Sequence, residues 1–481
     1  MGKVKTAVIW SIIEKFGLQA ISLIIGLFLA RLLSPADFGL IGMTSIFISL
    51  SNVFIEAGFS NALVRKLDRD DYDLSTAFYF NIIVGVIMYS ILYIVAPYIA
   101  SFFDEQILCS LIRIIGLNVL FNSLCIVQHA QLIADLKIRE KTIIGFLTQI
   151  PIGLLTIFLA YKGLGVYALA VQSVGGCFLS TFLLWHFVKW RPSLKYSQKS
   201  MKYLWGFGSN IIAANLIGTI FNEIYSLLIG KKFGKQELGY YTKGRSLAMY
   251  PNMVFIGVIQ NIALPILSKY QDKTSEMLSE YRNMAKLMNG IMSIVSGLLI
   301  VIAAPLIIML WSDKWIDSIW IFQFIIIINI LSPFGTLNLI LLQVINKTKY
   351  TLKLEYIKKP VAILIILFLI PYGIKGLLYA QLLMAIFETF LNATAPKKFI
   401  NYKYRWQLYD LIQYLYPILI SCLLSFSILS LFKVNVLFQL IIGSVAYLSA
   451  YTFILLIRKD TVFYPYLNKF LNEKFLKKLL S

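Results

Sequence analysis

Residues 231–245 read KKFGKQELGYYTKGR, and residues 31–45, earlier in the chain, read RLLSPADFGLIGMTS. Without a gap, Asp37 aligns with Glu237 and Gly39 aligns with Gly239. Each stretch is a short charged segment that leads through a glycine into a new apolar run. Internal similarity of this kind indicates a duplicated architecture, and in membrane proteins it predicts related halves with a site between them.

The composition is that of an integral membrane protein. Of 481 residues, 59% are hydrophobic and only 14% are charged, whereas soluble domains average about 25% charged residues. Apolar runs of about 20 residues, which cross the hydrocarbon core as helices, recur along the whole chain. We therefore expect an all-α polytopic membrane protein with about 14 transmembrane helices, at roughly 8–30, 38–58, 75–97, 107–128, 142–161, 165–188, 204–229, 238–264, 284–310, 319–344, 355–371, 375–395, 408–431 and 435–457.

Positive charge is distributed unevenly between the predicted loops. Of the 44 Lys and Arg residues, 32 lie in or close to the two tails and the even-numbered loops, 8 in the odd-numbered loops and 4 inside spans. Because Lys and Arg accumulate on the cytoplasmic side, we expect both termini in the cytoplasm. The same rule accounts for the net charge of +21 without nucleic acid as a partner.

Further similarities extend the repeat along the chain. YKGLGVYALA begins at Tyr161 and PYGIKGLLYA begins at Pro371, each before a span. We expect an N-terminal six-helix lobe at residues 1–200, a second six-helix lobe at 201–400, and an additional helix pair with a basic cytoplasmic tail at 401–481. Because six is an even number, both lobes enter the membrane in the same direction, which predicts a parallel repeat.

Polar side chains recur at helical spacing in the first two spans of each half. Lys15 aligns with Asn215, and Asn52 aligns with Asn252. Because a polar group facing lipid is costly, such stripes should face a cavity or another helix. We expect a hydrated cavity whose polar lining includes Gln19, Asn52, Asn215, Thr219, Asn222 and Asn252.

Charged residues inside spans are the candidates for substrate and ion binding. A charge at mid-span costs about 2.5–3.5 kcal/mol on insertion scales, although charges near span ends can snorkel or pair. A cationic cavity suits an anionic substrate, and the candidate cations are Lys15, Arg113, Lys243 and Arg245. Carboxylates suit coupling to an H+ or Na+ gradient, and the candidates are Glu14, Glu56 and Glu223. We expect no bound metal and no other cofactor.

An aspartate cluster at residues 68–73 suggests a different chemistry. It contains the DxD spacing that some glycosyltransferases use to hold a metal ion on a sugar nucleotide. The cluster lies in a short predicted cytoplasmic loop beside Arg65 and Lys66, so a solvated loop is the better interpretation.

Three segments carry a resemblance to a known family: ARLLSPADFGLIGMTSIF from Ala30, EAGFSNALVRK from Glu56, and ELGYYTKGRSLAMYP from Glu237 with its continuation NIALPILSKYQ. They resemble Wzx-type polysaccharide flippases, in the branch that includes colanic and teichuronic acid exporters of the multidrug/oligosaccharidyl-lipid/polysaccharide exporter superfamily. The resemblance covers about residues 1–400. It implies two six-helix bundles around a cavity that opens alternately to either side of the membrane.

The resemblance also implies a transporter rather than an enzyme. Such a protein moves undecaprenyl-pyrophosphate-linked oligosaccharide units across the bacterial cytoplasmic membrane for surface polysaccharide synthesis. Related flippases receive the pyrophosphate on cavity Arg and Lys residues and couple transport to an ion gradient. Membrane lipids and the polysaccharide polymerase machinery are further expected partners. The open alternatives are a multidrug exporter of the same superfamily, a membrane glycosyltransferase and a non-transporting assembly scaffold.

Overall fold

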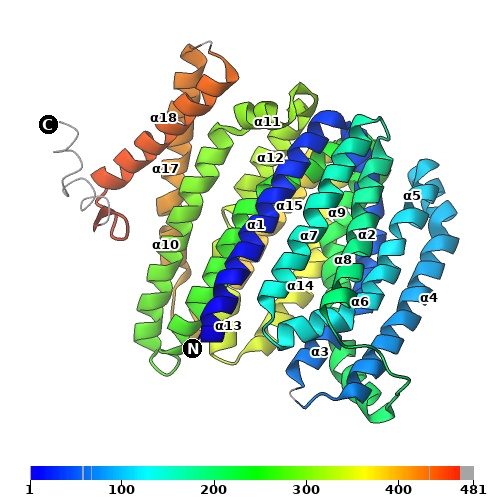
Figure 1. Cartoon of the computed structure of the whole chain (residues 1–481). Helices are drawn as coiled ribbons and strands as arrows, with labels where there is room; N and C mark the ends of the chain where they lie inside the picture. Colours follow the sequence, from blue (N-terminus) through cyan, green and yellow to red (C-terminus); the bar gives the residue numbers. More distant parts are fainter. Residues whose placement is uncertain (1, 57–58, 67, 433, 466–481) are drawn as a thin grey trace. The chain divides into compact units, whose positions relative to one another are not determined.

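The structure is a computed structural model that describes residues 2–56, 59–66, 68–432 and 434–465 (Figure 1). These residues form helices joined by short turns, and none of the described residues forms a β-strand. The first helices are α1 (Gly2–Leu32), α2 (Pro35–Glu56), α3 (Phe59–Arg65), α4 (Asp71–Phe103), α5 (Ile107–Ile115), α6 (Leu117–Ala134), α7 (Ile138–Tyr161), α8 (Val166–Phe187) and α9 (Gln198–Ser268).

The remaining elements include two short 3-10 helices, η1 and η2. In chain order they are α10 (Thr274–Val301), α11 (Ala303–Trp311), η1 (Asp313–Trp315), α12 (Ile316–Asn329), α13 (Ser332–Val344), α14 (Thr348–Leu369), η2 (Ile370–Tyr372), α15 (Gly373–Asn392), α16 (Thr394–Ile400), α17 (Tyr404–Leu431) and α18 (Val436–Ile457). Residues 466–481 of the predicted basic tail lie outside the described residues.

Twelve segments of the described chain are long and apolar enough to cross a membrane as helices. Two of them, Ile212–Ser268 and Thr348–Ile400, are 57 and 53 residues long. The first is broken at Gly234, whose φ of 83° is one that glycine adopts readily, and the second at η2 and Gly373. Each is long enough to cross twice. The all-α polytopic fold is therefore confirmed, whereas the count of 14 crossings stays a prediction.

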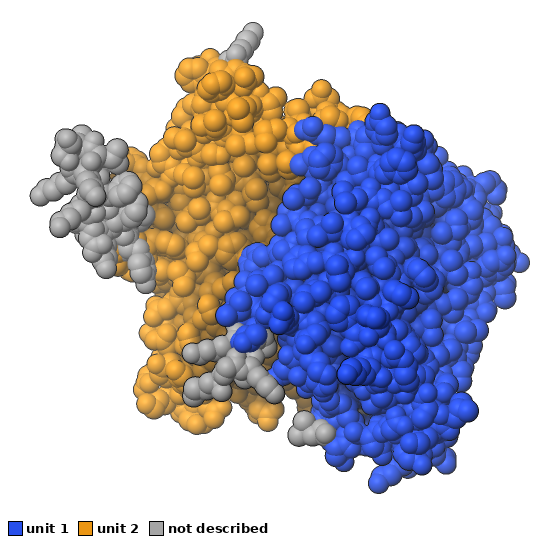
Figure 2. Space-filling model, viewed as in Figure 1, with its two compact units in different colours: residues 1–242 blue, residues 243–481 orange. Residues whose placement is uncertain are grey.

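The chain divides into two compact units, residues 1–242 and 243–481, coloured separately in Figure 2. The boundary lies inside α9. Residues 231–242 belong to the first unit because they pack on α2 and form ion pairs with the turn between α4 and α5. The predicted lobes at 1–200 and 201–400 follow the sequence repeat instead of this packing boundary, and that division stays a prediction.

In the first unit, α1 and α7 lie side by side (Figure 1). Small residues bring them together: a Cβ added at Gly145 would lie 2.9 Å from Leu18 of α1, and one at Gly153 would lie 2.0 Å from Ile25. Close approach at small residues is the usual basis of helix packing in membranes, where apolar surface alone gives little driving force. The glycines therefore set the spacing of the helix pair that carries the candidate site.

The two repeated stretches meet in the first unit. A Cβ added at Gly39 would lie 1.7 Å from the backbone oxygen of Lys235, and one at Gly239 would lie 1.8 Å from that of Pro35. Each glycine thus contacts the residue four positions before the other glycine, which is the reciprocity of a twofold relation. The positions aligned in the sequence are therefore equivalent at this crossing of α2 and the second segment of α9.

Two ion pairs lie beside the crossing. Lys231 is 2.8 Å from Asp104, and Lys235 is 2.9 Å from Glu105. They join the basic turn of the second repeat to the acidic turn between α4 and α5.

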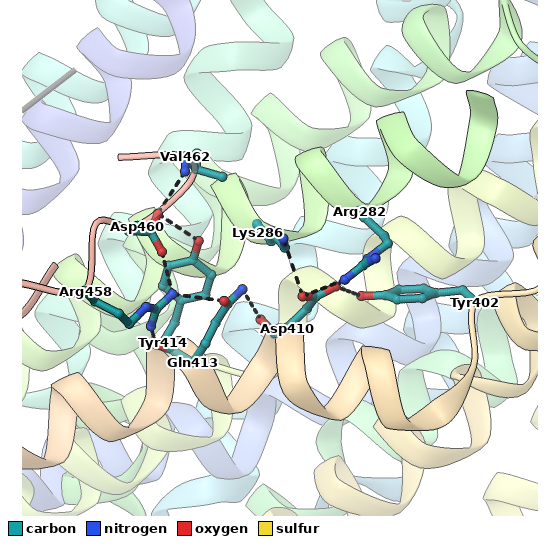
Figure 3. A network of polar contacts seen from close by, with 9 residues as sticks. All are labelled: Arg282, Lys286, Tyr402, Asp410, Gln413, Tyr414, Arg458, Asp460 and Val462. Atoms are coloured by element: carbon teal, nitrogen blue, oxygen red, sulfur yellow. Dashed lines mark hydrogen bonds and ion pairs between the residues drawn. The ribbon is translucent and has the colours of Figure 1, made fainter. Parts of the chain in front are cut away.

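In the second unit, a buried polar network joins α17 to α10 (Figure 3). The Asp410 carboxylate is 0% exposed, and it accepts two hydrogen bonds from Arg282, at 2.8 and 3.1 Å. The Tyr402 hydroxyl donates to it at 2.6 Å, and Lys286 lies 3.7 Å away. Because a buried carboxylate is stable only with such partners, the network holds the first turns of α17 against α10.

Candidate functional site

A polar pocket of about 470 Å³ lies between α1 and α7 of the first unit. From α1 it is lined by Glu14, Lys15, Leu18 and Gln19, together with Ser11 and Ser22. These positions recur every three or four residues, so they share one face of the helix. A polar face thus lies on a helix that is otherwise apolar enough to span a membrane.

The charges at this pocket are distributed over the two helices. Glu14 forms an ion pair of 2.8 Å with Lys141 of α7 rather than with its neighbour Lys15. Adjacent residues on a helix point in different directions, whereas facing residues on packed helices can meet. Lys141 of α7 thus balances the negative charge of Glu14. The pocket therefore carries a net positive charge, which comes from Lys15.

The candidate residues of the seventh predicted span lie on the segment of α9 that precedes the break at Gly234. Asn215 and Asn222 are exposed, whereas Thr219 and Glu223 are half-buried. All four belong to the first unit, as α1 does. They lie outside the set of described residues that line the α1–α7 pocket.

The two aligned asparagines of the second and eighth predicted spans each form a hydrogen bond with an asparagine of another helix. Asn122 of α6 donates a hydrogen bond to Asn52 at 3.2 Å. Asn252 of α9 donates to Asn329 of α12 at 3.4 Å and accepts from Ser332 at 2.6 Å. Polar side chains inside membranes commonly join helices in this way. The structure places both asparagines in helix–helix contacts, and a role in lining a cavity stays a prediction.

The other candidate cations lie against aromatic rings or on the second unit. The Arg113 guanidinium lies 4.2 Å from the ring centre of Tyr93 on α4, a cation–π contact. Lys243 lies 5.4 Å from the ring of Trp311 and 6.0 Å from that of Trp315. Lys243 and Arg245 belong to the second unit. The structure therefore brings Lys15 together with Gln19 and Glu14, and it places Arg113 elsewhere in the first unit.

Glu56, a candidate for ion coupling, lies at the last residue of α2 and is exposed. It adjoins residues 57–58, which are outside the described ranges. Its position at a helix end contrasts with that of Glu14, which lies within α1 at the polar pocket.

Three aspartates of the cluster at residues 68–73 form the start of α4. Asp70 caps α4 and forms a capping box with Asp73. Asp73 is 1% exposed and pairs with Lys66 at 2.6 Å, and this hydrogen bond raises the pKa of Lys66. Asp71 accepts hydrogen bonds from Trp190, Ser193 and Lys195. Asp70, Asp71 and Asp73 thus have structural partners at the start of α4, and the buried Asp73 lies in the helix rather than in the predicted solvated loop.

Sequence reasoning missed two residues of this site. Gln149 of α7 lines the pocket, and Lys141 is the partner of Glu14. Gln149 could have been found as a polar residue within an apolar span. The pairing of Lys141 with Glu14 could not, because it depends on which helices pack together.

Comparison with known proteins gives the family. The model of the family described as "Polysaccharide biosynthesis protein" matches residues 28–320, which is more than half of the chain. The teichuronic acid biosynthesis protein TuaB of Bacillus subtilis (strain 168) is 24% identical over 289 residues, covering 58% of this chain and 59% of TuaB. The match thus spans less than two thirds of that relative.

Two further comparisons agree. The lipopolysaccharide biosynthesis protein WzxC of Escherichia coli (strain K12) is 21% identical over 335 residues, covering 68% of this chain and 67% of WzxC. The solved structure of the lipid II flippase MurJ, in an inward closed conformation, superposes with a TM-score of 0.75 at 16% identity, covering 93% of this chain and 99% of MurJ. This likeness shows a shared fold. The resemblance to Wzx-type flippases is confirmed, and the chain belongs to the polysaccharide biosynthesis protein family.

Proposed function

We propose that this protein is a flippase that moves undecaprenyl-pyrophosphate-linked oligosaccharide units across the bacterial cytoplasmic membrane for surface polysaccharide synthesis. The observation that carries the proposal is the polar pocket between α1 and α7, which contains a cation and amides within spans that are otherwise apolar. A diphosphate needs cationic partners to leave water, and sugar hydroxyls need donors and acceptors. The pocket offers both.

The roles divide according to the chemistry of the side chains. Lys15 attracts the diphosphate, and the amides of Gln19 and Gln149 exchange hydrogen bonds with sugar hydroxyls. Glu14 is held by Lys141, so its charge does not cancel that of Lys15. The polyprenyl tail stays in lipid, because its transfer into a polar pocket would be unfavourable.

The names of the relatives support this assignment. TuaB is named for teichuronic acid biosynthesis, WzxC for lipopolysaccharide biosynthesis, and MurJ as a lipid II flippase. The first two names concern surface polysaccharides, and the third concerns the flipping of a lipid-linked precursor. The proposal combines the biosynthetic pathways of the first two names with the flippase activity of the third.

The energy source, orientation and partners form part of the same proposal. We assign coupling to an H+ or Na+ gradient, with Glu14, Glu56 and Glu223 as candidate carboxylates. The excess of Lys and Arg in the tails and even-numbered loops supports two cytoplasmic termini. The polysaccharide polymerase machinery would receive the exported unit.

The test uses the full chain in liposomes that contain an undecaprenyl-pyrophosphate-linked disaccharide. Flipping is measured as the rate at which the sugar moves between leaflets, followed with a membrane-impermeant oxidant. Lys15→Gln should slow flipping by about tenfold or more, because a charged hydrogen bond to phosphate contributes about 1.5–3 kcal/mol. Gln149→Leu should also slow it, through loss of sugar contacts.

The matched control is Lys199→Gln, which removes an exposed lysine of α9 that lies outside the pocket residues. It should flip at the wild-type rate. If liposomes that contain the wild-type protein do not flip the sugar, the proposed function is wrong. Flipping by wild type that is unchanged in Lys15→Gln would overturn the assigned site.

A further inference from the structure

A second pocket lies in the second unit, between α13, α15 and the first turns of α17. It has a volume of about 290 Å³ and is mostly apolar, with Phe334, Phe390 and Leu408 among its lining residues. Arg405 also lines it, at the end where α17 begins. The pocket therefore has an apolar lining that suits a hydrocarbon chain and one positively charged residue, Arg405.

The surroundings of Arg405 are strongly basic. Lys397, Lys398 and Lys403 precede it in the sequence, and residues 389–409 contain no Asp or Glu. Lys397 lies 4.4 Å from the ring of Tyr404, which is itself a pocket residue. The cluster belongs to a loop that the charge distribution places in the cytoplasm. Basic pockets between spans on that side suit anionic lipid headgroups.

A polar group without a partner lies beside the same pocket. Gln407 lines it and is 5% exposed. Its Nε2 donates to the backbone oxygens of Ala393 and Tyr402, at 3.0 and 2.6 Å. Because both partners are acceptors, the orientation of the amide is fixed. Its Oε1 is buried without a hydrogen-bond partner, although a buried acceptor normally has one. The amide thus ties the residues before α17 to the end of α15 at the wall of the pocket.

The platform under the pocket is held in place. Tyr402 and Asp410, which flank this turn of α17, belong to the buried network with Arg282 (Figure 3). Arg405 and Gln407 lie between these two anchor residues in the sequence. The pocket is therefore formed before a ligand arrives, which lowers the entropy cost of binding.

We propose that this pocket binds an anionic glycerophospholipid of the cytoplasmic leaflet, such as phosphatidylglycerol. The acyl chain occupies the apolar pocket, and the phosphate lies near Arg405 and Lys397. The site is separate from the polar pocket of the first unit, and it holds a resident lipid instead of the transported glycan.

The experiment measures lipid binding to the purified full-length protein by native mass spectrometry in detergent. Phosphatidylglycerol and phosphatidylcholine with identical acyl chains are compared. Wild type should bind phosphatidylglycerol more tightly. Lys397→Gln combined with Arg405→Gln should weaken phosphatidylglycerol binding roughly 30-fold and leave phosphatidylcholine binding little changed. Leu408→Trp should weaken both by filling the pocket.

Each variant has a matched control. Lys349→Gln removes an exposed lysine elsewhere, and Leu424→Trp enlarges an exposed leucine farther along α17. Both should bind like wild type. Equal affinity of wild type for the two lipids would overturn the proposal. So would unchanged binding in the double-charge variant, or displacement of phosphatidylglycerol by undecaprenyl phosphate at a lower concentration. Because binding is measured without transport, this result is independent of flipping.

Discussion

Replacing Gly39 with alanine should destabilise the first unit, because the new methyl group would meet backbone. Its Cβ would lie 1.7 Å from the backbone oxygen of Lys235, whereas ordinary contact begins at 3.4 Å. About 1.7 Å of separation must therefore open between α2 and the second segment of α9. The obstacle is a carbonyl of the main chain, so no side-chain rotation relieves it. Overpacking of this kind costs about 1–3 kcal/mol or more.

The measurement is thermal unfolding of the purified full-length protein in detergent, followed by tryptophan fluorescence. Gly218→Ala is the matched control, because a Cβ at Gly218 of α9 has nothing within 4 Å. There the substitution should raise stability by about 0.5–1 kcal/mol, through the better helix propensity of alanine. The same glycine-to-alanine change should thus lower stability at position 39 and raise it at position 218.

The double variant tests the reciprocity of the contact. Gly239→Ala alone should cost about as much as Gly39→Ala, because its Cβ would lie 1.8 Å from the backbone oxygen of Pro35. Once one substitution has separated the helices, the second meets less resistance. The double variant should therefore lose less stability than the sum of the losses in the two single variants. A Gly39→Ala protein that melts at or above the wild-type temperature would refute the reasoning.

Two further substitutions test other contacts of the structure. Asp410→Asn should lower the free energy of unfolding by about 3 kcal/mol, measured by thermal unfolding, because it leaves the charges of Arg282 and Lys286 without their buried counter-ion. A loss no larger than that of a surface substitution would contradict the stabilising role of the network that joins α17 to α10. Asp70→Ala should cost about 1 kcal/mol through loss of the cap on α4. It should leave flipping intact in the liposome assay, whereas a loss of sugar transfer by the stable variant would favour an enzyme.

Part of the candidate site was predictable from local pattern. The polar face with Lys15 and Gln19 follows from helical spacing in an apolar run, and the structure places both at one pocket. The same reasoning gave Asn52 and Asn252 the same expected role. The structure joins them to Asn122 and Asn329, because an amide inside a helix bundle forms a hydrogen bond with whichever polar group faces it, and their role in lining a cavity stays a prediction.

The sequence by itself determined the membrane class, the helical fold and the duplication, because hydropathy, span length and the repeated turn are properties of the chain alone. Only the tertiary structure decided that Glu14 pairs with Lys141, that Gln149 completes the polar pocket, and that Gly39 and Gly239 meet opposing backbone. Periodicity gives the face on which a residue lies, whereas its partner depends on contacts between helices that are distant in the sequence.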